Sequence, residues 1–192
     1  MDLIAEIKRK SVHSVGNLVP ILYFFFEKRI ALILLFSLMM IVLILEFLRL
    51  RFERVNRFFL WFFSGLEREH ERKGISAPAF TSISFFLTVL LFSKEIAIAA
   101  LFFLTLGDTV AALVGRRFGK RRFQDKSLEG SLACFLTCLF IGLLILDFKL
   151  ALFGALAATL AEASPLRIDD NFKIPLFSGG VMQVLKIISL KV

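Results

Sequence analysis

The sequence predicts an all-α fold, a polytopic transmembrane helical bundle. Of its 192 residues, 58% are hydrophobic and 24 are Phe, and the mean hydropathy is +0.81. The hydrophobic residues are grouped in long stretches, such as 30–45, which contains no charged residue. A bilayer core about 30 Å thick needs about 20 mainly apolar residues per helix, and a helix satisfies its own backbone amides. We expect residues 1–192 to form a single integral membrane domain.

About seven membrane segments are expected, each an apolar stretch bounded by polar residues. They lie at 12–26, 30–50, 75–93, 96–115, 130–146, 149–163 and 174–189. The first segment and the last two are short or interrupted by polar residues, so six is the alternative count. Residues 51–74 place Phe52, Val55 and Phe59 on one side and charged residues on the other. This pattern predicts an amphipathic helix lying in the membrane interface.

The basic residues predict which side of the membrane the loops face. With the N-terminus in the cytoplasm, 18 of the 24 Lys and Arg residues fall on the cytoplasmic side, where membrane proteins concentrate positive charge. The external connections at 27–29, 94–95 and 147–149 are very short. We therefore expect a multi-pass protein of the cell membrane whose active site is cytoplasmic. These loops explain the net charge of +8 better than nucleic-acid binding does.

Asp108 is the first candidate for chemistry, because it lies in an otherwise apolar segment. An ionised carboxylate inside a membrane helix is costly and is expected to face a wet cavity or a cation. A structural ion pair near the helix end is the alternative. The cytoplasmic end of the segment is only about two turns away, so Asp108 is within reach of a site at that surface.

The stretch 115–131 is the most informative part of the sequence. Two glycines would let the backbone approach a ligand closely, although their spacing is one residue too short for a Walker A loop. Lys126 and Ser127 precede a helix N-terminus, which favours binding of phosphate. Glu129 in the same turn is placed to bind a metal that bridges phosphates. An ordinary positive-inside loop is the alternative explanation for the basic residues.

A third polar cluster follows the sixth segment. It contains Glu162, Asp169, Asp170 and Asn171. Carboxylate and amide oxygens are suited to a hard cation such as Mg²⁺, which also binds phosphate oxygens. A solvated turn between helices is the alternative.

Other polar or reactive residues carry weaker signals. Arg9 and His13 would share a helix face near the N-terminus, with Lys10 beside them, but orientation charges explain them equally simply. Glu46 and Arg49, three residues apart, are expected to pair or to line the same cavity. The two cysteines, at positions 134 and 138, are expected to be packing residues.

Together these motifs resemble the CTP-dependent lipid-alcohol kinases, which include dolichol, phytol and farnesol kinases and the yeast-type diacylglycerol kinase. The matching blocks are Arg9-Lys10-x-x-His13, Gly107-Asp108-Thr109, Gly115-Arg116-x-Phe118-Gly119-Lys120, Lys126-Ser127-x-Glu129-Gly130-Ser131 and Asp170-Asn171-x-x-Ile174-Pro175. Their order and spacing match over nearly the whole chain. The central block, 107–131, is shared with phosphatidate cytidylyltransferases, whose C-terminal signature is replaced here by Asp-Asp-Asn and Ile-Pro.

The resemblance implies transfer of the terminal phosphoryl group of CTP to the hydroxyl of a membrane lipid, with Mg²⁺ or another divalent cation as cofactor. Such a reaction demands mainly positioning and charge neutralisation. The resemblance makes Asp108, Glu129 and Asp170 the expected catalytic residues, and these three with Glu162 the expected metal ligands. The residues expected to bind the nucleotide and its phosphates are Arg9, Lys10, His13, Arg116, Gly119, Lys120, Lys126, Ser127, Gly130 and Asn171, with Arg117 behind them.

Three other functions are weighed against this one. A cytidylyltransferase would make a CDP-lipid from CTP. A carrier built around Asp108 would need polar residues at both ends of its helices, whereas here they lie almost entirely on one side. A purely structural subunit would not need the polar clusters to coexist. The resemblance implies a polyprenol or other isoprenoid alcohol, or diacylglycerol, as the acceptor, and the sequence determines neither which of these it is nor the oligomeric state.

Overall fold

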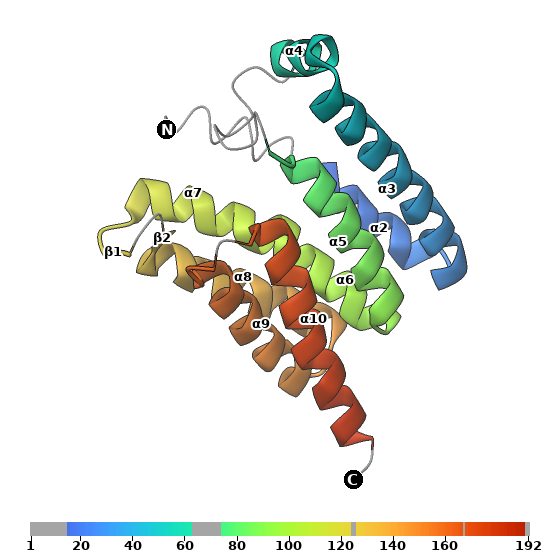
Figure 1. The fold of residues 1–192 in the computed structure, drawn as a ribbon. Coiled ribbons are helices and arrows are strands. Elements are labelled where there is room, and N and C mark those ends of the chain that lie inside the picture. Colours follow the sequence, from blue (N-terminus) through green and yellow to red (C-terminus); the bar gives the residue numbers. More distant parts are fainter. Residues whose placement is uncertain (1–14, 63–73, 124–125, 167, 191–192) are drawn as a thin grey trace.

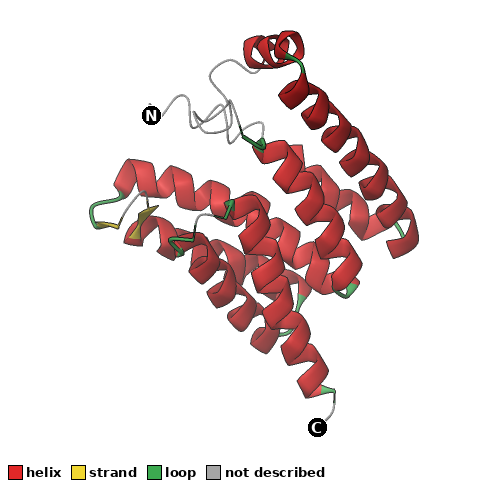
Figure 2. Ribbon diagram, viewed as in Figure 1, coloured by secondary structure: helices red, strands yellow, loops and turns green. Residues whose placement is uncertain are grey.

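The computed structural model describes residues 15–62, 74–123, 126–166 and 168–190, and these are almost entirely helical (Figures 1 and 2). The elements are η1 (Val15–Asn17), α2 (Leu18–Phe25), α3 (Lys28–Arg51), α4 (Glu53–Phe62), α5 (Ala77–Leu91), α6 (Lys94–Phe102), the π-helical turn η3 (Phe103–Gly107), α7 (Asp108–Phe118), β1 (Arg122–Phe123), β2 (Lys126–Ser127), α8 (Leu128–Ile145), α9 (Phe148–Ala163) and α10 (Asp170–Ser189). The expected all-α membrane fold is confirmed. The short antiparallel ribbon β1–β2 was not predicted.

Within the described residues, four helical stretches are long and apolar enough to cross a membrane. They are Lys28–Arg51, Lys94–Phe118, Leu128–Ile145 and Asp170–Ser189. The other three predicted segments also contain helices, but shorter ones, of which α5 has 15 residues. At 1.5 Å per residue α5 is about 22 Å long, less than the hydrocarbon thickness of about 30 Å. Seven complete spans therefore stay a prediction.

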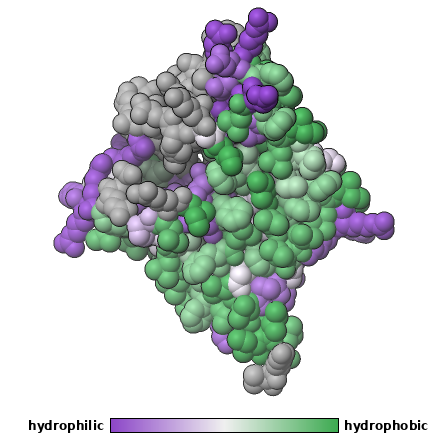
Figure 3. Space-filling view, in the orientation of Figure 1, coloured by the Kyte–Doolittle hydropathy of each residue, from purple (hydrophilic) through white to green (hydrophobic). Residues whose placement is uncertain are grey.

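The helices form a bundle in which α10 contacts helices from both the earlier and the later part of the chain. The helices α7, α8, α9 and α10 pack in succession, and α10 also contacts α5 and α6 (Figure 1). The centre is α6, where every residue of 96–101 is buried. By contrast, α3 packs on α5 at the edge of the bundle. Its exposed Ile33, Phe36 and Phe47 suit a lipid environment, and Figure 3 shows an apolar surface over most of the visible face.

Two lysines tie one end of the bundle together. Lys28 Nζ donates hydrogen bonds to the carbonyl oxygens of Leu90 and Phe92 at 3.1 and 2.9 Å. Reciprocally, Lys94 Nζ donates to two carbonyl oxygens at the end of α2, both at 3.0 Å. These bonds satisfy the carbonyls that a helix C-terminus leaves unpaired. The short connections 26–27 and 92–93 therefore lie side by side, as the predicted topology requires.

The predicted interfacial helix is represented by α4, which lies across the end of α3 (Figure 1). Its sequence separates charged from apolar residues in the way expected of an amphipathic helix. The remainder of the predicted segment, 63–73, lies outside the described residues. Its placement in the membrane interface stays a prediction.

The expected pairing of Glu46 and Arg49 is confirmed. Arg49 Nη2 lies 2.6 Å from Glu46 Oε1, and both side chains are buried. Ser76 donates to both carboxylate oxygens, from its backbone amide at 2.8 Å and its hydroxyl at 2.9 Å. Arg49 also donates to the Gly74 carbonyl at 2.6 Å and stacks 5.0 Å from the Phe59 ring centre. The pair therefore fixes the end of α3 to the beginning of α5.

The variant Arg49→Met should lower the free energy of unfolding by about 3–5 kcal/mol, because it leaves Glu46 as a buried charge without its cation. Adding Glu46→Gln should recover much of this loss. The measurement is thermal unfolding in detergent, with Arg54→Met on the exposed surface of α4 as the matched control. Equal stability of the single variant and the unaltered protein would contradict the structural role of the pair.

Candidate active site

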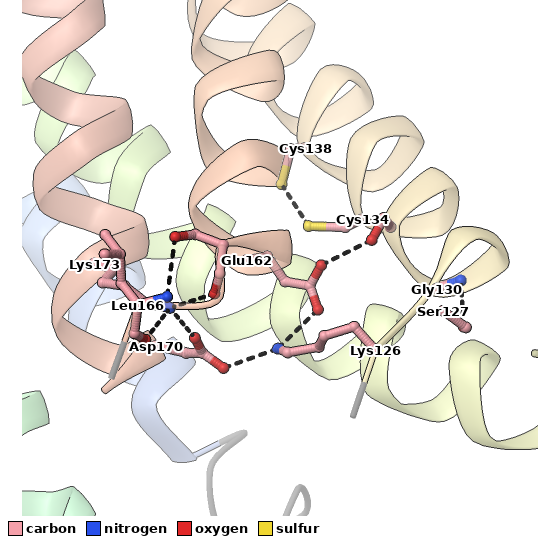
Figure 4. A network of polar contacts seen from close by, with 11 residues as sticks. Lys126, Ser127, Gly130, Cys134, Cys138, Glu162, Leu166, Asp170 and Lys173 are labelled. Atoms are coloured by element: carbon pink, nitrogen blue, oxygen red, sulfur yellow. Dashed lines mark hydrogen bonds and ion pairs between the residues drawn. The ribbon is translucent and has the colours of Figure 1, made fainter. Parts of the chain in front are cut away.

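Four charged side chains from three elements, Lys126 of β2, Glu162 of α9 and Asp170 and Lys173 of α10, form one network (Figure 4). Lys126, in β2, places Nζ 2.8 Å from Glu162 Oε1 and 2.9 Å from Asp170 Oδ2. The other oxygen of Asp170 lies 3.0 Å from Lys173 Nζ. The ends of α9 and α10 and the segment that precedes α8 are thus joined through a single lysine. Sequence analysis named Lys126, Glu162 and Asp170 as site residues, and the structure brings these three together.

The side chains of this network differ in how deeply they are buried in the protein. The side chain of Glu162 is only 4% exposed, and its second oxygen accepts a hydrogen bond from Ser131 Oγ at 3.1 Å. The side chains of Asp170 and Lys126 are 21% and 27% exposed. A ligand that approaches from outside the bundle therefore meets Asp170 and Lys126 first, whereas Glu162 supports them from within.

Lys173 completes the network, although the sequence, where it follows the third polar cluster, had given it no role in the site. Besides Asp170, its ammonium donates to the carbonyl oxygens of Ser164 and Leu166 at 3.2 and 3.4 Å. These bonds close the turn that follows α9. The only local signal in the sequence is the spacing of Asp170 and Lys173, which places them three residues apart on one helix face.

Asp108 belongs to the same electrostatic environment. It is buried at the first turn of α7. Burial disfavours the charged form of Lys126, but the negative charges of Asp170, Asp108 and Glu162 outweigh that effect and raise the pKa of Lys126 above its ordinary value. Lys126 therefore stays protonated at neutral pH. Its contribution to stability is fully present below the unfolded-state pKa of about 10.4 and is lost only as the pH rises through the higher folded-state pKa.

The π-helical turn η3 immediately precedes Asp108 and sets its direction. Such a turn inserts an extra residue and rotates the helix that follows. It is held on one side by Thr105, whose Oγ1 lies 2.5 Å from Asn17 Oδ1. On the other side, a Cβ at Gly107 would come within 2.6 Å of Cys138 Sγ. Neither the π turn nor these contacts was predicted from the sequence.

The expected packing role of the two cysteines is confirmed. Cys134 and Cys138 are both buried and both reduced, with 4.0 Å between their sulfur atoms. They lie between α8 and the π turn, beside Gly107.

Three predicted phosphate-binding residues lie where the C-terminal end of α7 packs closely against the N-terminal end of α8. A Cβ on Gly119 would lie 2.8 Å from Ser127 Cβ, and one on Gly130 would lie 2.8 Å from the Ala111 carbonyl. Ser127 is buried, and its Oγ caps α8 by accepting a hydrogen bond from the Gly130 amide at 3.1 Å. The structure thus gives Gly119, Ser127 and Gly130 a packing role beside the network. Their binding of phosphate stays a prediction.

The remaining predicted residues occupy different places. Glu129 accepts a hydrogen bond from the Arg121 backbone amide at 3.3 Å, so it contacts the loop after α7. Asn171 is buried in the first turn of α10. The side chains of Arg116, Arg117 and Lys120 are exposed at the end of α7 and in the following loop. Arg9, Lys10 and His13 lie outside the described residues.

The carboxylates of the network are the candidate ligands for a metal ion. Among the residues that the structure describes, no three His, Cys, Asp or Glu side chains are grouped as a metal site. However, Glu162 and Asp170 each direct one oxygen at the same cation, the Lys126 ammonium, at 2.8 and 2.9 Å. Carboxylate oxygens that converge on one positive charge are the donors that Mg²⁺ requires, with waters and phosphate oxygens completing its shell. These two carboxylates are donors of the type that a divalent cation requires, and the binding of such a cation stays a prediction.

An apolar groove of about 450 Å³ lies between α9 and α10. The residues that line it are Leu160, Ala161, Ser164, Leu166, Ile168, Phe172, Lys173, Leu176 and Phe177. Lys173 belongs both to this groove and to the charged network. The groove therefore opens beside the site that the charged residues form.

Comparison with known proteins gives the chain its relatives. It is 33% identical over 187 residues to an uncharacterized protein of Rickettsia prowazekii, covering 91% of this chain and 92% of the relative. It is 27% identical to CTP-dependent diacylglycerol kinase 1 of Saccharomyces cerevisiae, and this match covers 94% of this chain and 73% of the relative. It is 31% identical to probable phytol kinase 1 of Oryza sativa, and this match covers 53% of this chain and 40% of the relative. No protein-family model and no solved structure matches the chain.

Fold, site and relatives together define a membrane-embedded enzyme of the lipid kinase class. The chain belongs to the CTP-dependent lipid kinase family, and the resemblance seen in its motifs is confirmed.

The variant Lys126→Met should lower the free energy of unfolding by about 1–3 kcal/mol, because Glu162 and Asp170 lose a shared donor. Combining it with Glu162→Gln should recover part of the loss. Thermal unfolding in detergent measures both effects, and Lys120→Met, at an exposed position, is the matched control. An equal change for Lys120→Met and Lys126→Met would show that the network does not stabilise the fold.

Proposed function

We propose that this protein transfers the γ-phosphoryl group of CTP to the hydroxyl of a membrane lipid, an isoprenoid alcohol or diacylglycerol, at the cytoplasmic face. The supporting observation is the network in which Lys126 is shared by Glu162 and Asp170, close to Asp108. The names of the relatives, CTP-dependent diacylglycerol kinase and phytol kinase, support the choice of donor and acceptor.

The charges of the network suit a nucleotide that arrives with a divalent cation. Three carboxylates, Asp108, Glu162 and Asp170, face two ammonium groups, Lys126 and Lys173. This formal excess of one negative charge would repel a free triphosphate. A divalent cation held by these carboxylates, Mg²⁺ in our proposal, would reverse the sign and neutralise charge on the phosphates.

Lys126 is the residue best placed to hold phosphate oxygens. Its ammonium remains positively charged because of the surrounding acids, and its side chain is 27% exposed. The exposed basic residues at the end of α7, Arg116, Arg117 and Lys120, would attract the nucleotide toward it. In this proposal Arg9, Lys10 and His13 contribute from the N-terminal segment, and Asn171 orients the nucleotide.

Asp170 is the acid best placed to receive the acceptor hydroxyl. It is more exposed than Glu162 and contacts both lysines. The hydroxyl oxygen forms a bond to the γ-phosphorus while the bond to the β-bridging oxygen breaks. CDP then leaves with that oxygen, and the hydroxyl proton passes to the Asp170 carboxylate. In a loose transition state this carboxylate mainly orients the hydroxyl.

Incubation of the purified protein with γ-labelled CTP and a panel of lipid alcohols should yield labelled lipid phosphate and CDP. Labelled ATP should yield much less. The panel contains a polyprenol, phytol, farnesol and diacylglycerol, and the products are separated by chromatography. Release of pyrophosphate together with a CDP-lipid would instead identify a cytidylyltransferase. Absence of any labelled lipid across the panel would overturn the kinase proposal.

Asp108→Asn and Asp170→Asn should each lower kcat at least about a hundredfold while leaving the protein folded, since each removes a charge from the site without altering side-chain shape. Steady-state kinetics and thermal unfolding measure the two properties separately. Asp147→Asn is the matched control, because Asp147 caps α9 and Asn caps helices about as well. Normal turnover in Asp108→Asn would refute the role given to that residue.

A further inference from the structure

We infer that the groove between α9 and α10 holds the hydrocarbon chain of the acceptor alcohol, with the hydroxyl end beside Lys173 and Asp170. This inference rests on the proposed function and adds a binding site for the second substrate. The groove has a volume of about 450 Å³, which lies within the range of about 300–1,000 Å³ for small-molecule sites.

The lining of the groove matches an amphipathic molecule with a single polar end. Seven of its nine residues are apolar, and the two others are Ser164 and Lys173. These two residues are in contact, because the Lys173 ammonium donates to the Ser164 carbonyl at 3.2 Å. The polar end of the groove therefore coincides with the edge of the charged network, where Lys173 meets Asp170 at 3.0 Å.

The groove is open to its surroundings along its apolar part. Leu160 on α9 and Phe177 on α10 are 65% and 52% exposed. Because α10 is long and apolar enough to cross a membrane, these exposed side chains face the hydrocarbon phase in a bilayer. A lipid alcohol can thus slide into the groove from the membrane and does not need to leave it. The apolar part of this route disfavours the charged nucleotide.

The two lysines divide the site between the two substrates. Lys126 contacts one oxygen of Asp170, and Lys173 contacts the other. Only Lys173 lines the groove. The nucleotide phosphates are therefore assigned to the side of Lys126 and the lipid to the side of Lys173, and Asp170 lies where the hydroxyl and the γ-phosphoryl group would meet.

A lipid alcohol suits this groove better than a second protein chain. A stable protein interface buries roughly 1,200–2,000 Å² of surface, whereas this groove is a small concavity between two neighbouring helices. Its contact with the charged network through Lys173 also favours a ligand with one hydroxyl over a purely apolar partner.

The first test narrows the groove by Leu160→Trp. We expect the KM for the lipid alcohol to rise about tenfold or more, as for other misfits in apolar pockets, while the KM for CTP changes less than twofold. Leu144→Trp is the matched control, because Leu144 lies on α8 and is 71% exposed. An unchanged lipid KM in active Leu160→Trp protein would overturn the inference.

The second test does not depend on turnover. In lipid nanodiscs, a lipid alcohol that carries a diazirine in its hydrocarbon chain is added without CTP and irradiated. Mass spectrometry should find the crosslinked lipid on the residues of α9 and α10 that line the groove, severalfold more than on the part of α8 around Leu144, which is 71% exposed. Crosslinking in the groove alone supports the inference, whereas equal crosslinking of both surfaces or of neither overturns it. A protein that is crosslinked in the groove yet makes no lipid phosphate would refute the proposed function but keep the lipid site.

Discussion

The ammonium group of Lys126, shared by Glu162 and Asp170, is the interaction on which the architecture of the site depends. Charged groups inside a membrane protein are costly unless they are paired, and here one cation satisfies acids from two different helices. The arrangement joins α9 and α10 to the segment that precedes α8. It also holds the two acids close together, because each places one oxygen within 3 Å of the same ammonium group. In our proposal, the grouping that joins these elements is also the grouping that binds a metal-bound nucleotide.

Close helix packing places the other parts of the site around this ion pair. Small residues between α7 and α8 allow the two backbones to approach, as the contacts of Gly119 and Gly130 show. The π turn then directs Asp108 toward the same region, where its charge acts on Lys126. Glycines that resembled a phosphate-binding loop in the sequence thus have a demonstrated packing role in the structure.

The site lies between two environments with opposite chemistry. Exposed basic residues at the end of α7 form one side, and the apolar groove between α9 and α10 forms the other. A kinase that acts on a membrane lipid must combine a highly charged donor with a hydrophobic acceptor. Asp170 and its two lysines stand at the boundary, which gives a physical reason for alternating acids and lysines at this place.

The sequence by itself determined the helices, the membrane character, the family and most members of the charged network. Hydrophobic stretches and local spacing depend on the residues of a single segment, so the Glu46–Arg49 pair could also be predicted from the sequence. Only the tertiary structure decided which distant residues meet, as Lys126 meets Asp170 across 44 positions. It likewise decided the π turn, the role of Lys173 and the groove. These features depend on how neighbouring helices cross and how closely they pack, and one helix's own residues do not specify that geometry.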